Sequence, residues 1–323
     1  MGGSSYDRDV YSDSSSSGWG SSYSSFGASS YSASKLSSTD LDDCMLPNNK
    51  ILESKTKNPI IIVLDVTGSN IEFARVVYDK MPMLYGQIEQ KRYLKDFDIA
   101  ICAVGDAYTD DYPMQVGDFA KGIELDSWLE KLVLEGYGGG QEKESYELMA
   151  YYLYKNTKFV PGSDPIIFFI GDEAPYPSVS MNQAARFGID CVEGGCSNPF
   201  ELLRRKSNDN VFMLLNKFCG RNFKNEITSA WQKVLAPEHV IKINEEKSIV
   251  DLMLGIISMH SSARTLETYK VDMLDRGQTH ERIERVSQSL EGLSKTLVPV
   301  KISGTITNVT SSENKSTQKG RRL

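Results

Sequence analysis

The sequence feature that most constrains the fold is an unbroken apolar run, Ile60 to Leu64, which ends abruptly in Asp65. A strand that is apolar on both faces must be buried on both faces, so this run predicts a central strand of a parallel sheet. Thr67 and Ser69 follow Asp65 at alternate positions. Ligand sites of open α/β sheets lie just beyond the carboxyl ends of such strands, so these three side chains stand where binding or chemistry is expected.

The middle of the chain alternates strand-like and helix-like segments. Further strands are predicted at 97–104, 165–170, 210–215 and 239–243, with a short edge strand at 114–116. Helical spacing occurs at 71–88, with a kink expected at Pro82, and again near 125–132, 144–153, 226–235 and 247–260. Strands that alternate with helices of this length predict right-handed βαβ units. We therefore expect a doubly wound α/β domain with a central, mostly parallel sheet and helices on both faces.

Composition divides the chain into four segments. Residues 1–45 are rich in Ser, Gly and Tyr and contain hardly any aliphatic residues, so we expect a disordered tail. This tail is either a solvated linker or a segment that self-associates or is phosphorylated. Residues 46–262 are expected to form the α/β domain, 263–302 a C-terminal helical appendage with a short strand at 298–302, and 303–323 a second disordered tail.

The helix expected from Glu281 onward has two interpretations. Its apolar residues follow the spacing of a coiled-coil seam: Ile283, Val286, Leu290, Leu293 and Leu297. The pattern lasts only about two heptads and contains Gly292, whereas a coiled coil usually needs three or four. Packing of this helix on its own domain is therefore favoured over oligomerisation through it, and a homo-oligomer stays the alternative.

The charge and the cysteine content of the chain indicate which partners and which cellular compartment to expect. The net charge of −7 argues against a nucleic-acid binder, which usually presents a basic face. We also expect no membrane span and no secretory signal, because neither pattern is found in the sequence. The five cysteines are scattered, and Cys191 and Cys196 have no nearby second pair or histidine to complete a zinc set. A cytoplasmic protein is the expectation.

Three predicted loops converge at one end of the sheet and carry oxygen ligands. The first provides Asp65, Thr67 and Ser69, the second follows three glycines with Gln141, and the last provides Asp172 directly after a second apolar strand. Carboxylate and hydroxyl oxygens suit Mg²⁺ or Mn²⁺. The consecutive glycines are explained by backbone that must come close to an ion. In the simpler alternative, Asp65 and Ser69 only cap the first helix. Asp106, at the end of the second strand, is a candidate outer acid.

The first-loop motif, in which Asp65, Thr67 and Ser69 surround Gly68, together with Asp172, resembles the von Willebrand factor A (vWA) family and its metal-ion-dependent adhesion site. The resemblance covers roughly residues 58–260. The glycine-rich loop with Gln141 is similar to that of intracellular members of the family rather than that of adhesion receptors. The family usually places a Thr in this loop, whereas this chain has Tyr137 just before the glycines, so the resemblance leaves Gln141 or a water as the third ligand.

The resemblance implies a function in binding. A cation held mostly by hydroxyls and water can accept one more carboxylate from outside, which implies a metal-dependent adaptor that captures an Asp or Glu of a partner protein. Intracellular members commonly work beside AAA+ ATPases of the MoxR type, which makes this a partner class that the resemblance allows. We expect no enzyme, because no general base stands next to the motif. The alternatives are a self-assembling structural protein and a hydrolase in which the cation activates water.

Overall fold

The computed structural model describes residues 41–68, 70–134, 143–218 and 220–297. Every strand predicted for the central sheet is present within one or two residues of its expected bounds. The elements are, in chain order, η3 (Asp43–Met45), β1 (Leu52–Glu53), β2 (Asn58–Asp65), α2 (Ile71–Gln90), β3 (Phe97–Val104), β4 (Met114–Val116), α3 (Glu124–Leu129), β5 (Lys143–Glu144), α4 (Tyr146–Asn156), β6 (Thr157–Lys158), β7 (Ile166–Gly171), β8 (Ala174–Pro175), α5 (Met181–Arg186), α6 (Pro199–Lys206), β9 (Val211–Leu215), α7 (Asn225–Val234), η4 (Pro237–His239), β10 (Val240–Lys242), η5 (Glu246–Ser248), α8 (Ile249–His260), α9 (Leu266–Asp275) and α10 (His280–Thr296).

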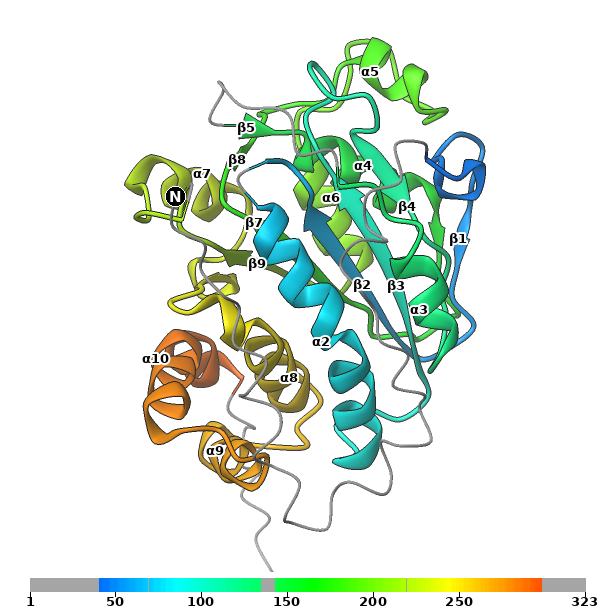
Figure 1. Cartoon of the computed structure of the whole chain (residues 1–323). Coiled ribbons are helices and arrows are strands. Elements are labelled where there is room, and N and C mark those ends of the chain that lie inside the picture. The colour runs from blue at the N-terminus through cyan, green and yellow to red at the C-terminus, as the bar shows by residue number, and fades with distance from the viewer. Residues whose placement is uncertain (1–40, 69, 135–142, 219, 298–323) are drawn as a thin grey trace, which may run out of the picture.

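The central sheet has the strand order β10-β9-β7-β2-β3-β4 (Figure 1). Its strands pair in parallel, except that the edge strand β4 runs antiparallel to β3. After β2 the chain adds β3 and then β4 on one side of β2. Later it adds β7, β9 and β10 on the other side of β2. The order of the strands therefore reverses between β2 and β7, which is the usual location of ligand sites in such sheets.

Helices cover both faces of the sheet, as the sequence predicts. Alternate side chains of a strand point to opposite faces, and in β2 the residues Ile60, Ile62 and Leu64 belong to one core while Ile61 and Val63 belong to the other. The first core is closed mainly by α2 and α8, and the second by α4, α6 and α7 (Figure 1). The mixed α/β fold is thus confirmed, with α2 running through Pro82 without interruption.

The ends of the described chain belong to the same core. Met45 is fully buried in the first core, so the folded part begins before residue 46, where the sequence placed the end of the tail. In α10 the seam residues Ile283, Val286, Leu290 and Leu293 are buried in that core as well, so this helix packs on its own domain, as favoured above. The predicted strand at 298–302, most of the first tail and all of the second lie outside the described residues.

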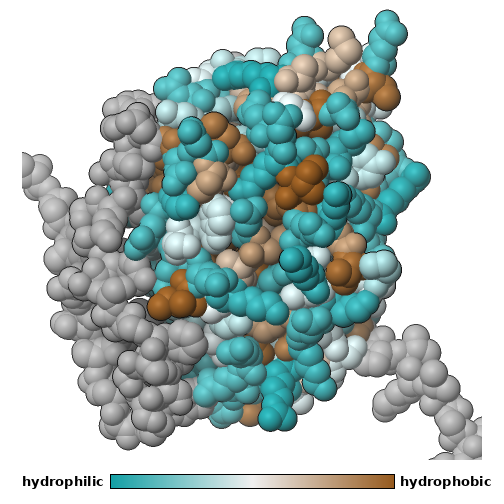
Figure 2. Space-filling model, turned by 90° about the vertical axis from the view of Figure 1, so that its right-hand side faces the viewer, coloured by the Kyte–Doolittle hydropathy of each residue, from teal (hydrophilic) through white to brown (hydrophobic). Residues whose placement is uncertain are grey.

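Large hydrophobic side chains are exposed at only a few places in the part of the chain that the structure describes. Figure 2 shows one side of the molecule, on which hydrophilic residues surround small groups of hydrophobic ones. Among the described residues, Val271 and Leu274 are both exposed on α9, and the other exposed large hydrophobic side chains come from separate elements and loops: Leu46, Ile51, Tyr108, Ile123, Met181 and Val192. In the part of the chain that the structure describes, no helix combines the length and the apolar character needed to cross a membrane.

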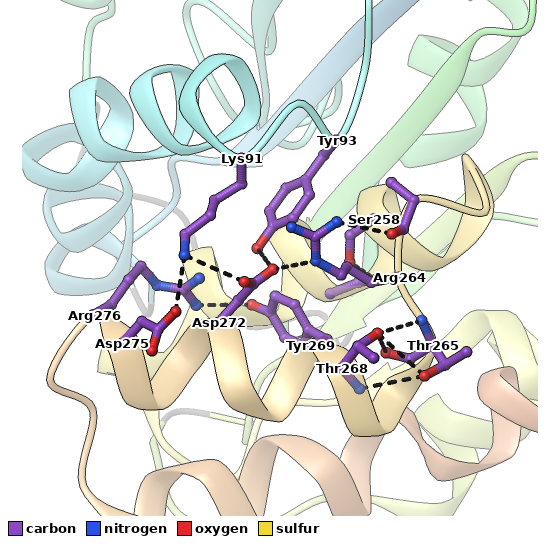
Figure 3. Close-up of polar contacts among 12 residues, drawn as sticks. Lys91, Tyr93, Ser258, Arg264, Thr265, Thr268, Tyr269, Asp272, Asp275 and Arg276 are labelled. Atoms are coloured by element: carbon purple, nitrogen blue, oxygen red, sulfur yellow. Dashed lines mark hydrogen bonds and ion pairs between the residues drawn. The ribbon is translucent and has the colours of Figure 1, made fainter.

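A polar network fastens α9 to the end of α2 (Figure 3). The carboxylate of Asp272 accepts hydrogen bonds from the Tyr93 hydroxyl at 2.8 Å and Arg264 Nε at 2.6 Å, and it pairs with Lys91 Nζ at 3.2 Å. Burial alone would raise the pKa of Asp272, but the hydrogen bonds from Tyr93, Arg264 and Lys91 hold this pKa below its usual value. Asp272 is therefore ionised at neutral pH and ties three segments of chain together.

Replacement of Asp272 by Ala should lower the free energy of unfolding by about 2–3 kcal/mol, because it leaves Tyr93, Arg264 and Lys91 without their common acceptor. Urea unfolding of the full chain measures this. The matched control is Asp275→Ala, since Asp275 also pairs with Lys91 at 3.2 Å but keeps half of its side chain exposed, so we expect a change within about 1 kcal/mol. Equal losses for the two variants would contradict the central role of Asp272.

Candidate metal centre

Two carboxylates meet where the strand order reverses. Asp65 is the last residue of β2, and Asp172 directly follows β7, which pairs with β2 in parallel. Both side chains are almost completely buried. The side-chain amide of Asn70 donates to Asp65 Oδ2 at 3.0 Å and to Asp172 Oδ1 at 2.5 Å. The structure therefore brings together two of the acids that the sequence singled out, on either side of one amide nitrogen.

Asp65 accepts four hydrogen bonds, all from neutral donors. Its Oδ1 receives the backbone N–H of Thr67 at 2.9 Å and the Thr67 hydroxyl at 2.6 Å. Its Oδ2 receives the amide of Asn70 and, at 2.6 Å, the hydroxyl of Tyr146. A carboxylate offers about four acceptor positions, so those of Asp65 are all used. None of these donors brings a positive charge to the buried carboxylate.

The electrostatics of the site are unfavourable for two anions. Burial, followed by the nearby Asp172 carboxylate, raises the pKa of Asp65 well above its usual value. The partial positive charge at the N-terminus of α2 offsets part of this repulsion, because Asn70 stands at the N-cap position of that helix. A positive ion between the two carboxylates would offset much more.

A further buried acid lies close to this pair. Glu144 in β5 is 3% exposed, and its Oε2 is fully buried with no hydrogen-bond partner among the described residues. Burial, followed by the charges of Asp65, Glu173, Asp110 and Asp106, raises the pKa of Glu144 far above its usual value. Burial and the neighbouring acids thus favour the neutral form of Glu144, and acidic side chains gather at this edge of the sheet.

Asp106, the candidate outer acid, contacts Ser145, the residue before α4. It is 4% exposed and accepts hydrogen bonds from the backbone N–H of Tyr108 at 3.1 Å, the Tyr176 hydroxyl at 3.2 Å and the Ser145 hydroxyl at 3.4 Å. Ser145 immediately precedes Tyr146, the residue that contacts Asp65. Asp106 therefore fixes the start of α4, which presents Tyr146 to the site.

Sequence reasoning missed two residues of the site, Asn70 and Tyr146. Asn70 directly follows the Asp65–Ser69 motif, so the sequence did place it next to the predicted site. An Asn at the start of a predicted helix is usually interpreted as a helix cap, however. Tyr146 is 81 residues from Asp65 and fully buried against Trp231, with their ring centroids 5.1 Å apart. An aromatic residue at the start of an amphipathic helix reads as core, so no local signal pointed to its hydroxyl.

The described residues fit a hard divalent cation. Asp65, Thr67 and Asp172 offer carboxylate and hydroxyl oxygens, whereas Ser69 and Gln141 lie outside the described residues. Within residues 41–68, 70–134, 143–218 and 220–297, no group of three or more His, Cys, Asp or Glu side chains could hold a metal ion. Two carboxylates completed by hydroxyls and water are what Mg²⁺ or Mn²⁺ accepts, and the buried Glu144 Oε2, which has no hydrogen-bond partner among the described residues, adds another oxygen at this edge.

Comparisons with known proteins give distant structural similarities. No protein-family model matches the sequence, and no curated protein is detectably similar to it. Proximal thread matrix protein 1 from the mussel byssus aligns at a TM-score of 0.42 and 12% identity over 64% of this chain and 49% of its own. The same protein with a zinc-occupied MIDAS motif gives 0.43 and 11%. The pilus adhesin SpaC from Lactobacillus rhamnosus GG gives 0.43 and 10% over 66% of this chain and 31% of its own. The chain thus spans about half or less of each matched protein.

Gly171 is needed for the close approach of Tyr146 to Asp65. A Cβ at this position would lie 1.9 Å from the Tyr146 hydroxyl oxygen and 2.9 Å from Asp65 Oδ2. We therefore expect Gly171→Ala to lower the midpoint of thermal unfolding by several degrees, corresponding to about 1–3 kcal/mol of overpacking. Circular dichroism melting of the full chain measures this.

Two further variants test the reason for that loss. Tyr146→Phe in the Gly171→Ala background removes the atom nearest to the new Cβ, so the double variant should recover part of the lost stability. Gly292→Ala is the control, because nothing lies within 4 Å of its added Cβ in α10 and we expect no loss there. Additive effects of Gly171→Ala and Tyr146→Phe would mean that the steric explanation is wrong.

Proposed function

We propose that this chain is a metal-dependent protein interaction module of the vWA type, which holds Mg²⁺ or Mn²⁺ at the switch point of its sheet and captures an acidic side chain of a partner protein. The observation that carries the proposal is the shared donor of Asp65 and Asp172. Two buried carboxylates stand at the ends of adjacent parallel strands, and the amide nitrogen of Asn70 lies between them. It is 3.0 Å from Asp65 Oδ2 and 2.5 Å from Asp172 Oδ1. Such a pair is a natural binding place for a divalent cation.

The roles of the residues follow from their contacts. Asp172 and Asp65 provide the negative charge, and the hydroxyl of Thr67 provides a neutral oxygen that still has acceptor capacity after it donates to Asp65. Tyr146 and Asn70 hold Asp65 in place. We assign Ser69 and Gln141 as further oxygen ligands on the basis of the sequence motif. A bound cation would supply the positive charge that attracts a partner's carboxylate.

The proposed partner is a protein that presents Asp or Glu, with an AAA+ ATPase of the MoxR type as one class to test. The many acids at this edge support a cation-dependent rather than a direct contact, because bare carboxylates repel an acidic ligand. The negative net charge also supports a protein partner over nucleic acid.

The test is titration calorimetry of the full chain with Mg²⁺ and with Mn²⁺. We expect saturable binding that Asp65→Asn and Asp172→Asn each weaken by more than about a hundredfold, because ligand changes exceed the roughly 10–100-fold effects of outer groups. The matched control is Asp98→Asn. Asp98 is also buried, but it lies at the start of β3, at the opposite end of the sheet, where it accepts from Ser54 and Thr56.

A pull-down with and without chelator then tests the binding of a partner. Capture that depends on Mg²⁺ and is lost in Asp65→Asn and Asp172→Asn, but kept in Asp98→Asn, would support the proposal. Absence of any Mg²⁺ or Mn²⁺ binding by the parent chain, or capture that is unchanged by chelator and by both site variants, would show that the function does not depend on this site.

A further inference from the structure

We infer that Asn70 is a built-in competitor of the cation: its side-chain amide locks Asp65 and Asp172 together, and the metal binds fully only when this amide leaves. The inference rests on the proposed function and concerns the regulation of the same site. The amide offers two N–H groups, and it directs them at one oxygen of each carboxylate, Asp65 Oδ2 and Asp172 Oδ1. It thus takes the acceptor positions that a bridging cation would need.

A chain of hydrogen bonds fixes which end of the Asn70 amide faces the carboxylates. The backbone N–H of Lys217 donates to Asn216 Oδ1 at 2.9 Å, so the Asn216 amide nitrogen must point the other way. That nitrogen lies 3.5 Å from Asn70 Oδ1 and donates to it. The Asn70 amide nitrogen is therefore directed at Asp65 and Asp172.

This direction prevents Asn70 from acting as a metal ligand in the present arrangement. To offer its oxygen to a cation, the Asn70 amide would have to flip, which would place its N–H groups against those of Asn216. Asn216 would then have to flip as well and turn its N–H groups toward the Lys217 N–H. A flip of Asn70 alone loses its contact with Asn216, and a flip of both amides loses the contact of Asn216 with the Lys217 N–H, so the locked orientation is preferred.

The position of Asn70 in the chain supports the same role. Asn70 occupies the N-cap of α2, where an Asn side chain ordinarily accepts a hydrogen bond from the first turn of the helix. Here the side chain makes no such bond. It is fully buried and is used for the two carboxylates instead. The chain thus forgoes a common helix-stabilising contact in favour of this one.

The experiment compares Asn70→Ala with the parent in the full chain, by Mg²⁺ titration calorimetry and by thermal unfolding in the presence of chelator. Removal of the lock should tighten Mg²⁺ binding by at least about tenfold. This factor corresponds to one charge-assisted hydrogen bond, which the cation no longer has to break. The same variant should unfold at a lower temperature in chelator, because the two carboxylates lose their common donor, and Mg²⁺ should restore more stability to it than to the parent.

The control is Asn156→Ala. Asn156 is also buried, but it donates to the carbonyl of Lys50, away from the site, so its Mg²⁺ affinity should equal that of the parent. If Asn70→Ala does not fold, Asn216→Ala replaces it. This variant frees the Asn70 amide to flip and should also tighten Mg²⁺ binding.

The outcomes separate this inference from the proposed function. Tighter Mg²⁺ binding by Asn70→Ala or Asn216→Ala than by the parent and by Asn156→Ala supports the lock, even if the parent itself binds no Mg²⁺. Binding by the parent that these variants leave unchanged or weaken overturns the lock and leaves the metal site standing. Absence of Mg²⁺ binding by the parent and all variants overturns both.

Discussion

Two carboxylates buried at adjacent strand ends repel each other, and the edge of this sheet is arranged around that constraint. Asp65 and Asp172 are kept in place by neutral donors from distant segments: Asn70 at the start of α2 and Tyr146 at the start of α4. Gly171 is required because any larger residue would collide with Tyr146 and Asp65. The geometry of this edge therefore depends on the placement of both layers of helices.

The positions of Asp65 and Asp172 could be predicted from the sequence because they depend only on the strands. A buried parallel strand reads as a continuous apolar run, and the acid that ends it must emerge at the carboxyl edge of the sheet. The parallel pairing of Ile60–Leu64 with Ile166–Ile170 then brings the two acids together. The same logic gave the mixed α/β fold and helices on both faces.

The remaining features depend on tertiary contacts that leave no periodic signal. The Tyr146 hydroxyl reaches Asp65 only because α4 packs across the sheet. Helix α9 falls within the predicted helical appendage, but the sequence did not give its bounds, because its main attachment is polar, through Asp272, and Tyr269 and Met273 are its only fully buried apolar residues. The spacing in α10 was read correctly as packing on its own domain, since close contact with α8 at Gly255 allows Leu290 to enter the core.

The same contacts bear on the choice between binding and hydrolysis. A hydrolase at this site would need a side chain that takes a proton from water. Asp65 has its acceptor positions filled by Thr67, Asn70 and Tyr146, so it has no free lone pair for this purpose. Glu144 has a free acceptor oxygen, but burial and its acidic neighbours raise its pKa so far that it is protonated at neutral pH. Asp65 in its present contacts and the protonated Glu144 therefore both lack the free, ionised oxygen that a general base needs. A cation at Asp65 would likewise require one of the present donors to leave, and the two-sided contact of Asn70 makes its amide the donor whose departure frees both carboxylates.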